Sequence, residues 1–186
     1  MHKALPLVLV LLLAGCTGSS GTSGGAPSTR MSITSVAFAD GGTIPELHTC
    51  DGARVSLPLV ITGFPNGTRS VAVTMKDPNG STPQEPRPTI NHWLVWNMTP
   101  TDGSVTFPAG ALPPGARHGD TNYGRGYTAP CPTPGGPTHS YNVTAYALDN
   151  SPDLYTGTRM DKLDEAMTGH VLAQASLHGA YTRKVA

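Results

Sequence analysis

The stretch NHWLVWNM, residues 91–98, has the composition of a strand buried in a protein interior. Aromatic and β-branched residues favour strands, and two tryptophans in so short a segment need a core that covers them. The second residue of this stretch is nevertheless the ionisable His92. A histidine at this place either serves the core or marks the edge of a binding site. Its neighbours on adjacent strands decide between the two.

Four further segments have the character of strands, namely residues 33–39, 57–61, 69–77 and 139–149. The 186-residue chain contains 22 glycines and 18 prolines, which indicates short strands joined by many turns. One helix is predicted over residues 161–178, because acidic residues fill its first turns and Gly179 follows its end. His170 is interpreted as a residue of this helix that packs on the sheet. These segments predict a mostly β domain with a C-terminal helix.

Three predicted strands carry an ionisable residue at one end of an apolar stripe. Side chains two positions apart share one face of a strand. Asp77 stands at the end of such a stripe, and His139 stands at the start of another. His92 likewise precedes Leu94 and Trp96. In an antiparallel sheet the end of one strand lies beside the start of the next, so the three polar residues are expected to meet at one rim. The alternative is three rim residues that find separate partners.

Such a cluster has a definite chemistry. Two imidazoles supply N–H donors, and an aspartate orients them by accepting a proton. The stretch TAPCPTPGG, residues 128–136, supplies a stiff wall, because proline fixes the backbone. The sequence therefore predicts a small, donor-lined cavity for an oxyanion such as phosphate or carboxylate.

Composition and missing motifs exclude several other functions. The formal net charge is zero and the sequence has no basic run, so nucleic acid is not an expected partner. The sequence has no H-E-x-x-H or C-x-x-C spacing for zinc, and outside the Gly/Ser-rich linker it has no G-x-S-x-G nucleophile motif. We therefore expect a binding protein rather than an enzyme, without a metal or another cofactor.

The N-terminal residues have the layout of an export signal. Lys3 is followed by an apolar run and then by LAGC, residues 13–16, which resembles the lipobox of bacterial lipoproteins. This predicts a signal peptide over residues 1–15, lipid on Cys16, a flexible Gly/Ser-rich linker over residues 16–30, and a folded domain over residues 31–186. The expected location is the outer side of a bacterial cell membrane. The alternative is an ordinary signal peptide with a chance cysteine.

Two cysteines remain after Cys16, and they form an even pair in a chain predicted to be exported. Cys50 and Cys131 are expected to form a disulfide in an oxidising compartment. The alternative is two reduced cysteines, because sequence does not fix the distance between them.

At these residues the sequence resembles the phosphatidylethanolamine-binding proteins, especially the bacterial branch related to Raf kinase inhibitor protein. The resemblance covers residues 44–183. It consists of nine short motifs in the order of the family: TCDG (49–52), LPL (57–59), GTRSVAV (67–73), DP (77–78), HWLVWN (92–97), NYGRGY (122–127), APCPTPG (129–135), HSYNVTAYALD (139–149) and HVLAQASLHGAYTR (170–183).

The resemblance implies a large central antiparallel sheet packed on a smaller sheet, and a pocket for anions such as phosphate or phospholipid head groups. The residues that match the pocket of the family are Asp77, Pro78, His92, His139 and Tyr141, with Pro130 or Pro132, or both, in its wall. Asn79 and Asn122 depart from the family, which usually has aspartate at both places. A protein-interaction role, such as inhibition of an envelope protease, is the alternative function that the resemblance implies.

Overall fold

The structure is a computed structural model that describes residue 1, residues 30–80 and residues 89–185. The predicted signal peptide, Cys16 and nearly all of the linker lie outside this part of the chain. The limits of the export signal, linker and folded domain therefore stay predictions.

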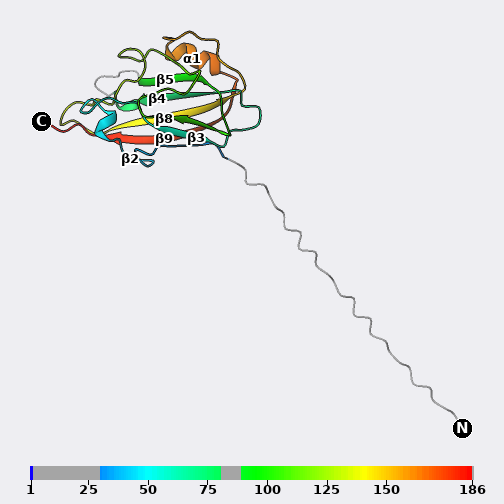
Figure 1. The fold of residues 1–186 in the computed structure, drawn as a ribbon. Helices are drawn as coiled ribbons and strands as arrows, with labels where there is room; N and C mark the ends of the chain where they lie inside the picture. Colours follow the sequence, from blue (N-terminus) through cyan, green and yellow to red (C-terminus); the bar gives the residue numbers. More distant parts are fainter. Residues whose placement is uncertain (2–29, 81–88, 186) are drawn as a thin grey trace.

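The described residues form two sheets, as Figure 1 shows. The large sheet has the order β2-β9-β8-β4-β5-β7, and its neighbouring strands are antiparallel except for the parallel pair β2 and β9. The small sheet has the antiparallel order β1-β3-β6. The predicted fold class, a mostly β protein with a large and a small sheet, is confirmed.

The strands and helices of the described residues have these bounds: β1 Ser32–Thr34, β2 Gly42–Thr43, η1 Glu46–His48, β3 Leu59–Thr62, β4 Ser70–Asp77, η2 Pro78–Gly80, β5 Ile90–Met98, β6 Ser104–Phe107, β7 Arg117–His118, β8 His139–Leu148, α1 Met160–Met167 and β9 Val171–Tyr181. Here η marks a short 3-10 helix.

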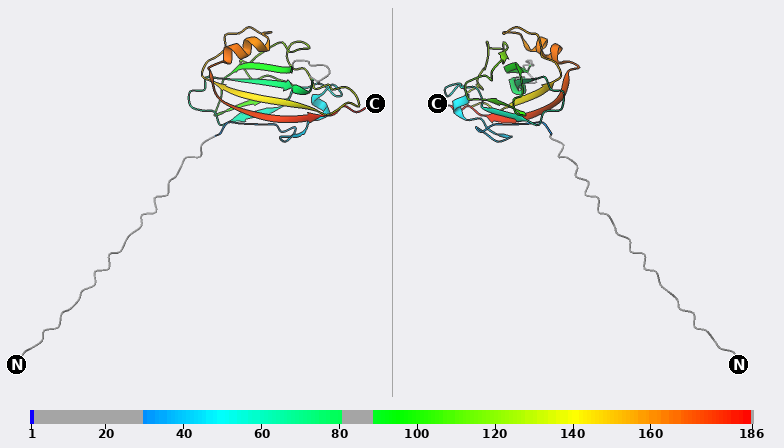
Figure 2. Two further views of the ribbon diagram at one scale, coloured as in Figure 1. Left: turned by 180° about the vertical axis from the view of Figure 1, so that it is seen from behind. Right: turned by 45° about the vertical axis from the view of Figure 1, so that its right-hand side comes forward.

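The strand β5 is buried on both of its faces, which explains why its sequence is so apolar. Trp93 and Val95 belong to the core between the two sheets. Leu94 and Trp96 belong to a second core on the opposite face, together with Leu163 and its neighbours on α1. Figure 2 shows α1, in orange, beside the large sheet.

A bulge at the start of β5 decides where His92 points. Met75 of β4 pairs with Trp93, but the next residue, Lys76, pairs with Asn91, so His92 is an extra residue in β5. Strict alternation would place His92 with Leu94 and Trp96, on the face that α1 covers. A bulge redirects the extra side chain. His92 instead contacts the ring of Tyr141, whose strand face belongs to the core between the sheets. The predicted face of His92 was therefore wrong.

The predicted helix over residues 161–178 was wrong in its second half. The helix α1 ends at Met167, and Val171–Tyr181 forms the strand β9 along β8. The apolar spacing of this region fits a helix, but pairing with the edge of β8 satisfies its backbone and overrides that pattern. Gly179 is not a helix stop: a Cβ built there would lie 2.6 Å from Ile44, so only glycine allows this close approach.

Two smaller predictions, the place of His170 and the length of the first strand, are also corrected. His170 lies in the turn between α1 and β9, about half exposed, and its Nδ1 lies 2.7 Å from Asp149 Oδ1. It does not pack on the sheet as a helix residue. The predicted strand over residues 33–39 is shortened to β1, because the Ser35 hydroxyl donates to Pro58 O and accepts from the N–H of Ala37. These bonds turn the chain out of the ladder.

Candidate functional site

Four polar residues converge at one end of the large sheet. Asp77 is the last residue of β4, and His139 is the first residue of β8. His92 lies near the start of β5, and Tyr141 lies on β8 on the same face as His139. Since β4 runs antiparallel to both of its neighbours, its end lies beside their starts. The convergence expected from the sequence is therefore present.

The carboxylate of Asp77 is the centre of this cluster. Asp77 is almost fully buried. Its Oδ2 lies 2.8 Å from Nδ1 of His139 and 3.9 Å from Nε2 of His92. Its Oδ1 accepts a 2.7 Å hydrogen bond from the backbone N–H of Asn79. The aspartate therefore fixes the ring of His139 and ties the end of β4 to η2.

The hydrogen bonds define which ring nitrogens carry protons. Nδ1 of His92 lies 2.9 Å from the carbonyl oxygen of Thr128, which can only accept, so Nδ1 of His92 donates. Nδ1 of His139 donates to the Asp77 carboxylate for the same reason. Each Nε2 therefore becomes a donor only when its ring takes up a second proton. Burial lowers the pKa of His92, and the smaller opposing effects include the charge of Asp77, which raises it.

Two buried polar atoms of the cluster have no hydrogen-bond partner among the described residues. They are Nε2 of His92 and the hydroxyl of Tyr141, which approaches the backbone N–H of Cys131 without a bond of good geometry. Burial raises the pKa of Tyr141 well above its usual value, and the charge of Asp77 adds to this, so its hydroxyl keeps a proton to donate. Unpaired buried groups are costly and are typical of functional sites.

The cluster lies in a cavity of about 790 Å³. Among the predicted site residues, those that line it are Asp77, His92, Pro132, His139 and Tyr141. Two predicted site residues, Pro78 and Pro130, do not line the cavity but lie beside it. Pro78 is exposed at the start of η2. Pro130 is buried, and its carbonyl oxygen accepts a hydrogen bond from the N–H of Cys50. The role of all these residues in ligand binding stays a prediction.

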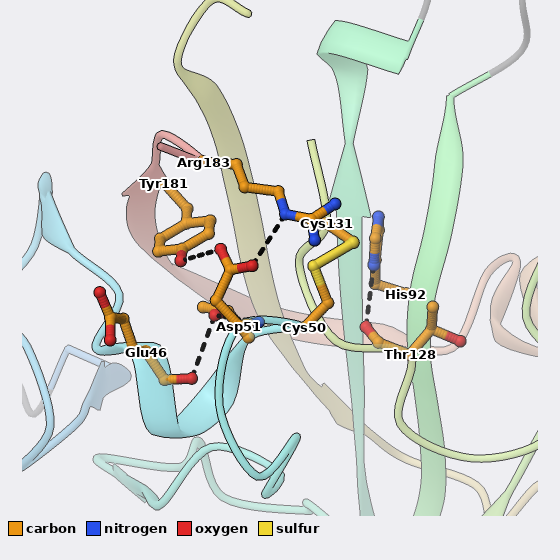
Figure 3. Close-up of a disulfide and its surroundings, with 9 residues drawn as sticks. Glu46, Cys50, Asp51, His92, Thr128, Cys131, Tyr181 and Arg183 are labelled. Atoms are coloured by element: carbon orange, nitrogen blue, oxygen red, sulfur yellow. Dashed lines mark hydrogen bonds and ion pairs between the residues drawn. A yellow bond between two sulfur atoms is a disulfide. The ribbon is translucent and has the colours of Figure 1, made fainter. Parts of the chain in front are cut away.

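Cys50 and Cys131 form a disulfide in the wall of this cavity, as predicted, and Figure 3 shows its surroundings. Next to it, Asp51 accepts hydrogen bonds from the hydroxyl of Tyr181 at 2.6 Å and from Nε of Arg183 at 2.8 Å. The bond from Tyr181 holds the pKa of Asp51 below its usual value. The turn after η1 is thus tied both to the end of β9 and to the wall at residue 131.

Sequence reasoning did not single out several lining residues. Tyr123 is two-thirds exposed, and its ring lies 6.4 Å from that of His92. Arg54 and Arg125 also line the cavity. Nε of Arg125 lies 2.9 Å from Oδ1 of Asp120. Tyr123 and Arg125 belong to the quoted motif NYGRGY, whereas nothing in the sequence marked Arg54 because it reaches the site only through the fold.

Within residues 30–80 and 89–185, no three histidine, cysteine or acidic side chains are grouped as a metal site would require. In the same part of the chain, no helix has the length and apolar character that a membrane span needs.

Comparison with known proteins places the chain in a family. The sequence profile of the family described as phosphatidylethanolamine-binding protein matches residues 34–182. A UPF0098 protein of Pyrococcus horikoshii is 32% identical over 197 residues, which cover 99% of this chain and 91% of that protein. A UPF0098 protein of Methanothermobacter thermautotrophicus is 38% identical over 157 residues, covering 82% and 99% of the two chains. The chain belongs to the phosphatidylethanolamine-binding protein family.

Two solved structures share the fold. One is a putative phosphatidylethanolamine-binding protein homologue from Chlamydia trachomatis, with a TM-score of 0.75 and 33% identity, covering 84% of this chain and all of that one. The other is YbcL of E. coli, described as a new member of the mammalian family, with a TM-score of 0.72 and 25% identity, covering 83% and 99% of the two chains. The likeness to the bacterial branch expected from the motifs is thereby confirmed.

Proposed function

We propose that this protein is a binding protein whose cavity takes a small anion of the phosphate or phospholipid head-group type. The observation that carries the proposal is the cluster of Asp77, His92, His139 and Tyr141 at the cavity wall. Three potential donors, on His92, His139 and Tyr141, line the same cavity, and those on His92 and Tyr141 have no partner among the described residues. An oxyanion accepts several hydrogen bonds at once and therefore fits such a group.

The buried carboxylate at the centre also supports an anion in this cavity. Asp77 stabilises the protonated form of an adjacent imidazole, because opposite charges at this distance attract. A bound anion near Nε2 of His92 would act in the same direction. His92 would then carry a positive charge close to two negative groups. Binding is therefore coupled to proton uptake.

We also propose that the protein acts outside the cytoplasm, attached to a bacterial membrane through lipid on Cys16. The support is the motif LAGC after an apolar run of signal length, together with the disulfide between Cys50 and Cys131. The Gly/Ser-rich linker gives the binding domain reach from the membrane surface.

The binding proposal is tested with the soluble domain, residues 31–186, and phosphate titrated by calorimetry and by NMR of the histidine rings. We expect shifts at both His92 and His139. His92→Ala and His139→Ala should each weaken phosphate binding about tenfold to hundredfold, because each removes a charge-assisted hydrogen bond. His178→Ala is the control: His178 is half exposed on β9 and pairs with Asp40, outside the cavity lining.

NMR chemical-shift changes at one histidine alone, or equal phosphate affinity in all three variants, would contradict the proposed anion site. Circular dichroism of each variant shows whether a lost affinity reflects a lost fold.

The membrane anchor is tested with Cys16→Ala in the full chain. We expect the variant to lose lipid addition and to leave the detergent phase in a phase-partition experiment, because the acyl chains supply the membrane affinity. Cys50→Ala is a control for the loss of a cysteine as such, and it should stay in the detergent phase. An unlipidated parent protein would disprove the lipobox assignment.

A further inference from the structure

We infer that the ligand carries a carboxylate in addition to its phosphate, with its phosphate at the histidines and its carboxylate at Arg54. This inference rests on the proposed anion site and specifies its ligand. It distinguishes this chain from one that would take the zwitterionic head group phosphoethanolamine, whose second group is an ammonium.

The charges that line the cavity carry the inference. Among the described lining residues the only acidic side chain is Asp77, and the strongly basic side chains are Arg54 and Arg125. Both oxygens of Asp77 already accept hydrogen bonds, from Asn79 and His139. No other carboxylate among the described lining residues remains for an ammonium group. A second negative group on the ligand meets two guanidinium groups instead.

Two neutral residues, Asn79 and Asn122, keep further negative charge away from the cavity. Asn79 lines the cavity, and its side-chain oxygen accepts the backbone N–H of Ser140 at 2.6 Å. Asn122 precedes Tyr123 in the wall, and its side-chain oxygen accepts the backbone N–H of Asn91 at 2.7 Å. Both amides therefore have structural partners that a carboxylate would also satisfy. With asparagine at both places, the cavity keeps these bonds without two negative charges.

The backbone at Arg54 is a second, independent observation. Its φ is 58°, in the left-handed region where a glycine or asparagine is far more common. Residues held in such conformations gather at ligand sites, and Arg54 lies exposed on the cavity wall. No described carboxylate pairs with it. Arg125, in contrast, is partly neutralised by Asp120. Arg54 is therefore the better partner for a carboxylate.

The test uses ligands that differ only in the tail attached to phosphate. Phosphoglycolate has a carboxylate tail, ethyl phosphate has a neutral tail of the same length, and phosphoethanolamine has an ammonium tail. Homologues of the first two ligands with one more methylene test a longer distance between the phosphate and the tail group. For the soluble domain we expect the carboxylate ligand to bind about threefold to tenfold more tightly than its neutral match. The ammonium ligand should bind more weakly than ethyl phosphate.

Arg54→Gln should abolish the preference for the carboxylate tail, measured as the ratio of the affinities for phosphoglycolate and ethyl phosphate in the same variant. Arg54→Gly should do the same without loss of stability, because glycine relieves the backbone strain. Arg69→Gln is the matched control, since Arg69 precedes the far end of β4, roughly 26 Å along the strand from Asp77.

The outcomes separate this inference from the proposed function. If the carboxylate ligand has no advantage at either length, or if phosphoethanolamine binds best, the inference is wrong while the anion site stands. If the preference survives in Arg54→Gln, the assignment to Arg54 is wrong. If none of the phosphates binds, the proposed function fails first.

Discussion

At the residue scale, three contacts of different kinds set the orientation and the protonation of His92. Thr128 O fixes its Nδ1 proton, Asp77 lies 3.9 Å from its Nε2, and the edge of its ring meets the ring of Tyr141 with centroids 5.2 Å apart. Burial lowers the pKa of His92 and so favours its neutral ring. We therefore expect His92 to serve the core when neutral and, in the proposed site, to bind an anion when protonated.

This gives a pH dependence whose sign follows from the lowered pKa. An anion binds the protonated His92, and that form is scarce above the ordinary histidine value of about 6.5. The affinity should therefore rise as the pH falls from about 8, by up to tenfold per pH unit for one proton. Sulfate is the suitable probe, because its charge is constant from pH 5 to 8. In His92→Gln, the slope of the logarithm of sulfate affinity against pH should be smaller by one proton.

Asp77→Asn provides a second check on the same residue. The charge of Asp77 raises the pKa of His92, so its removal should move the pH dependence of sulfate binding to more acidic values. An unchanged profile in both variants would mean that His92 takes up no proton on binding.

At the element scale, α1 and β9 show how one periodic segment divides into two kinds of structure. Leu163 and Met167 of α1 cover Leu94 and Trp96 of β5. After a turn of three residues the chain runs back as β9, whose eleven residues extend the sheet beyond β8. The helix covers the outer face of the sheet, while β9 extends the inner core towards β2. Both elements are needed to bury the large sheet.

Leu163→Ala should therefore lower the free energy of unfolding by about 2–5 kcal/mol, because it leaves a cavity under a fully buried side chain. Urea unfolding followed by tryptophan fluorescence measures this, since Trp96 lies in the same core. Lys162→Ala is the control on the same helix. Its ion pair with Glu165 is well exposed, so its loss should have little effect on the free energy of unfolding. Equal effects would contradict the packing of α1.

At the scale of the whole molecule, the cavity is assembled from segments far apart in the chain. Residues 50–54, the end of β4, the start of β5, residues 123–137 and the start of β8 all contribute to its wall. The disulfide joins the first of these segments to the fourth across 81 residues of sequence. It is a covalent link between two loops that are also joined by the hydrogen bond from the N–H of Cys50 to the carbonyl oxygen of Pro130.

Removal of this bond should destabilise the protein by about 4 kcal/mol on the chain-entropy model, because a long closed loop is released in the unfolded state. Denatured protein without reductant should show no free thiol from Cys50 and Cys131, and denaturant titration of the reduced protein should show the loss. Two free thiols in freshly isolated protein would contradict the disulfide. Cys50→Ala with Cys131→Ala should match the reduced protein.

Strands that alternate or are continuously apolar could be predicted from the sequence, and so could the convergence of Asp77, His92 and His139 at one rim. Period-two patterns are local, so they can be recognised without the fold, and the shared rim followed once these strands were taken as antiparallel neighbours. The family motifs added Tyr141 and the prolines to the set of predicted pocket residues. The pairing of Cys50 with Cys131 also followed, because only two cysteines remained in the predicted domain.

Three features depend on the folded chain: the face of His92, the division of residues 161–178 into helix and strand, and the presence of Arg54 at the site. The bulge depends on how β5 pairs with β4, and β9 exists because β8 offers an unpaired edge. Arg54 reaches the cavity through a turn that the disulfide and Asp51 hold in place. Pairings between distant segments are not encoded in any local pattern, so these features appear only when the chain is folded.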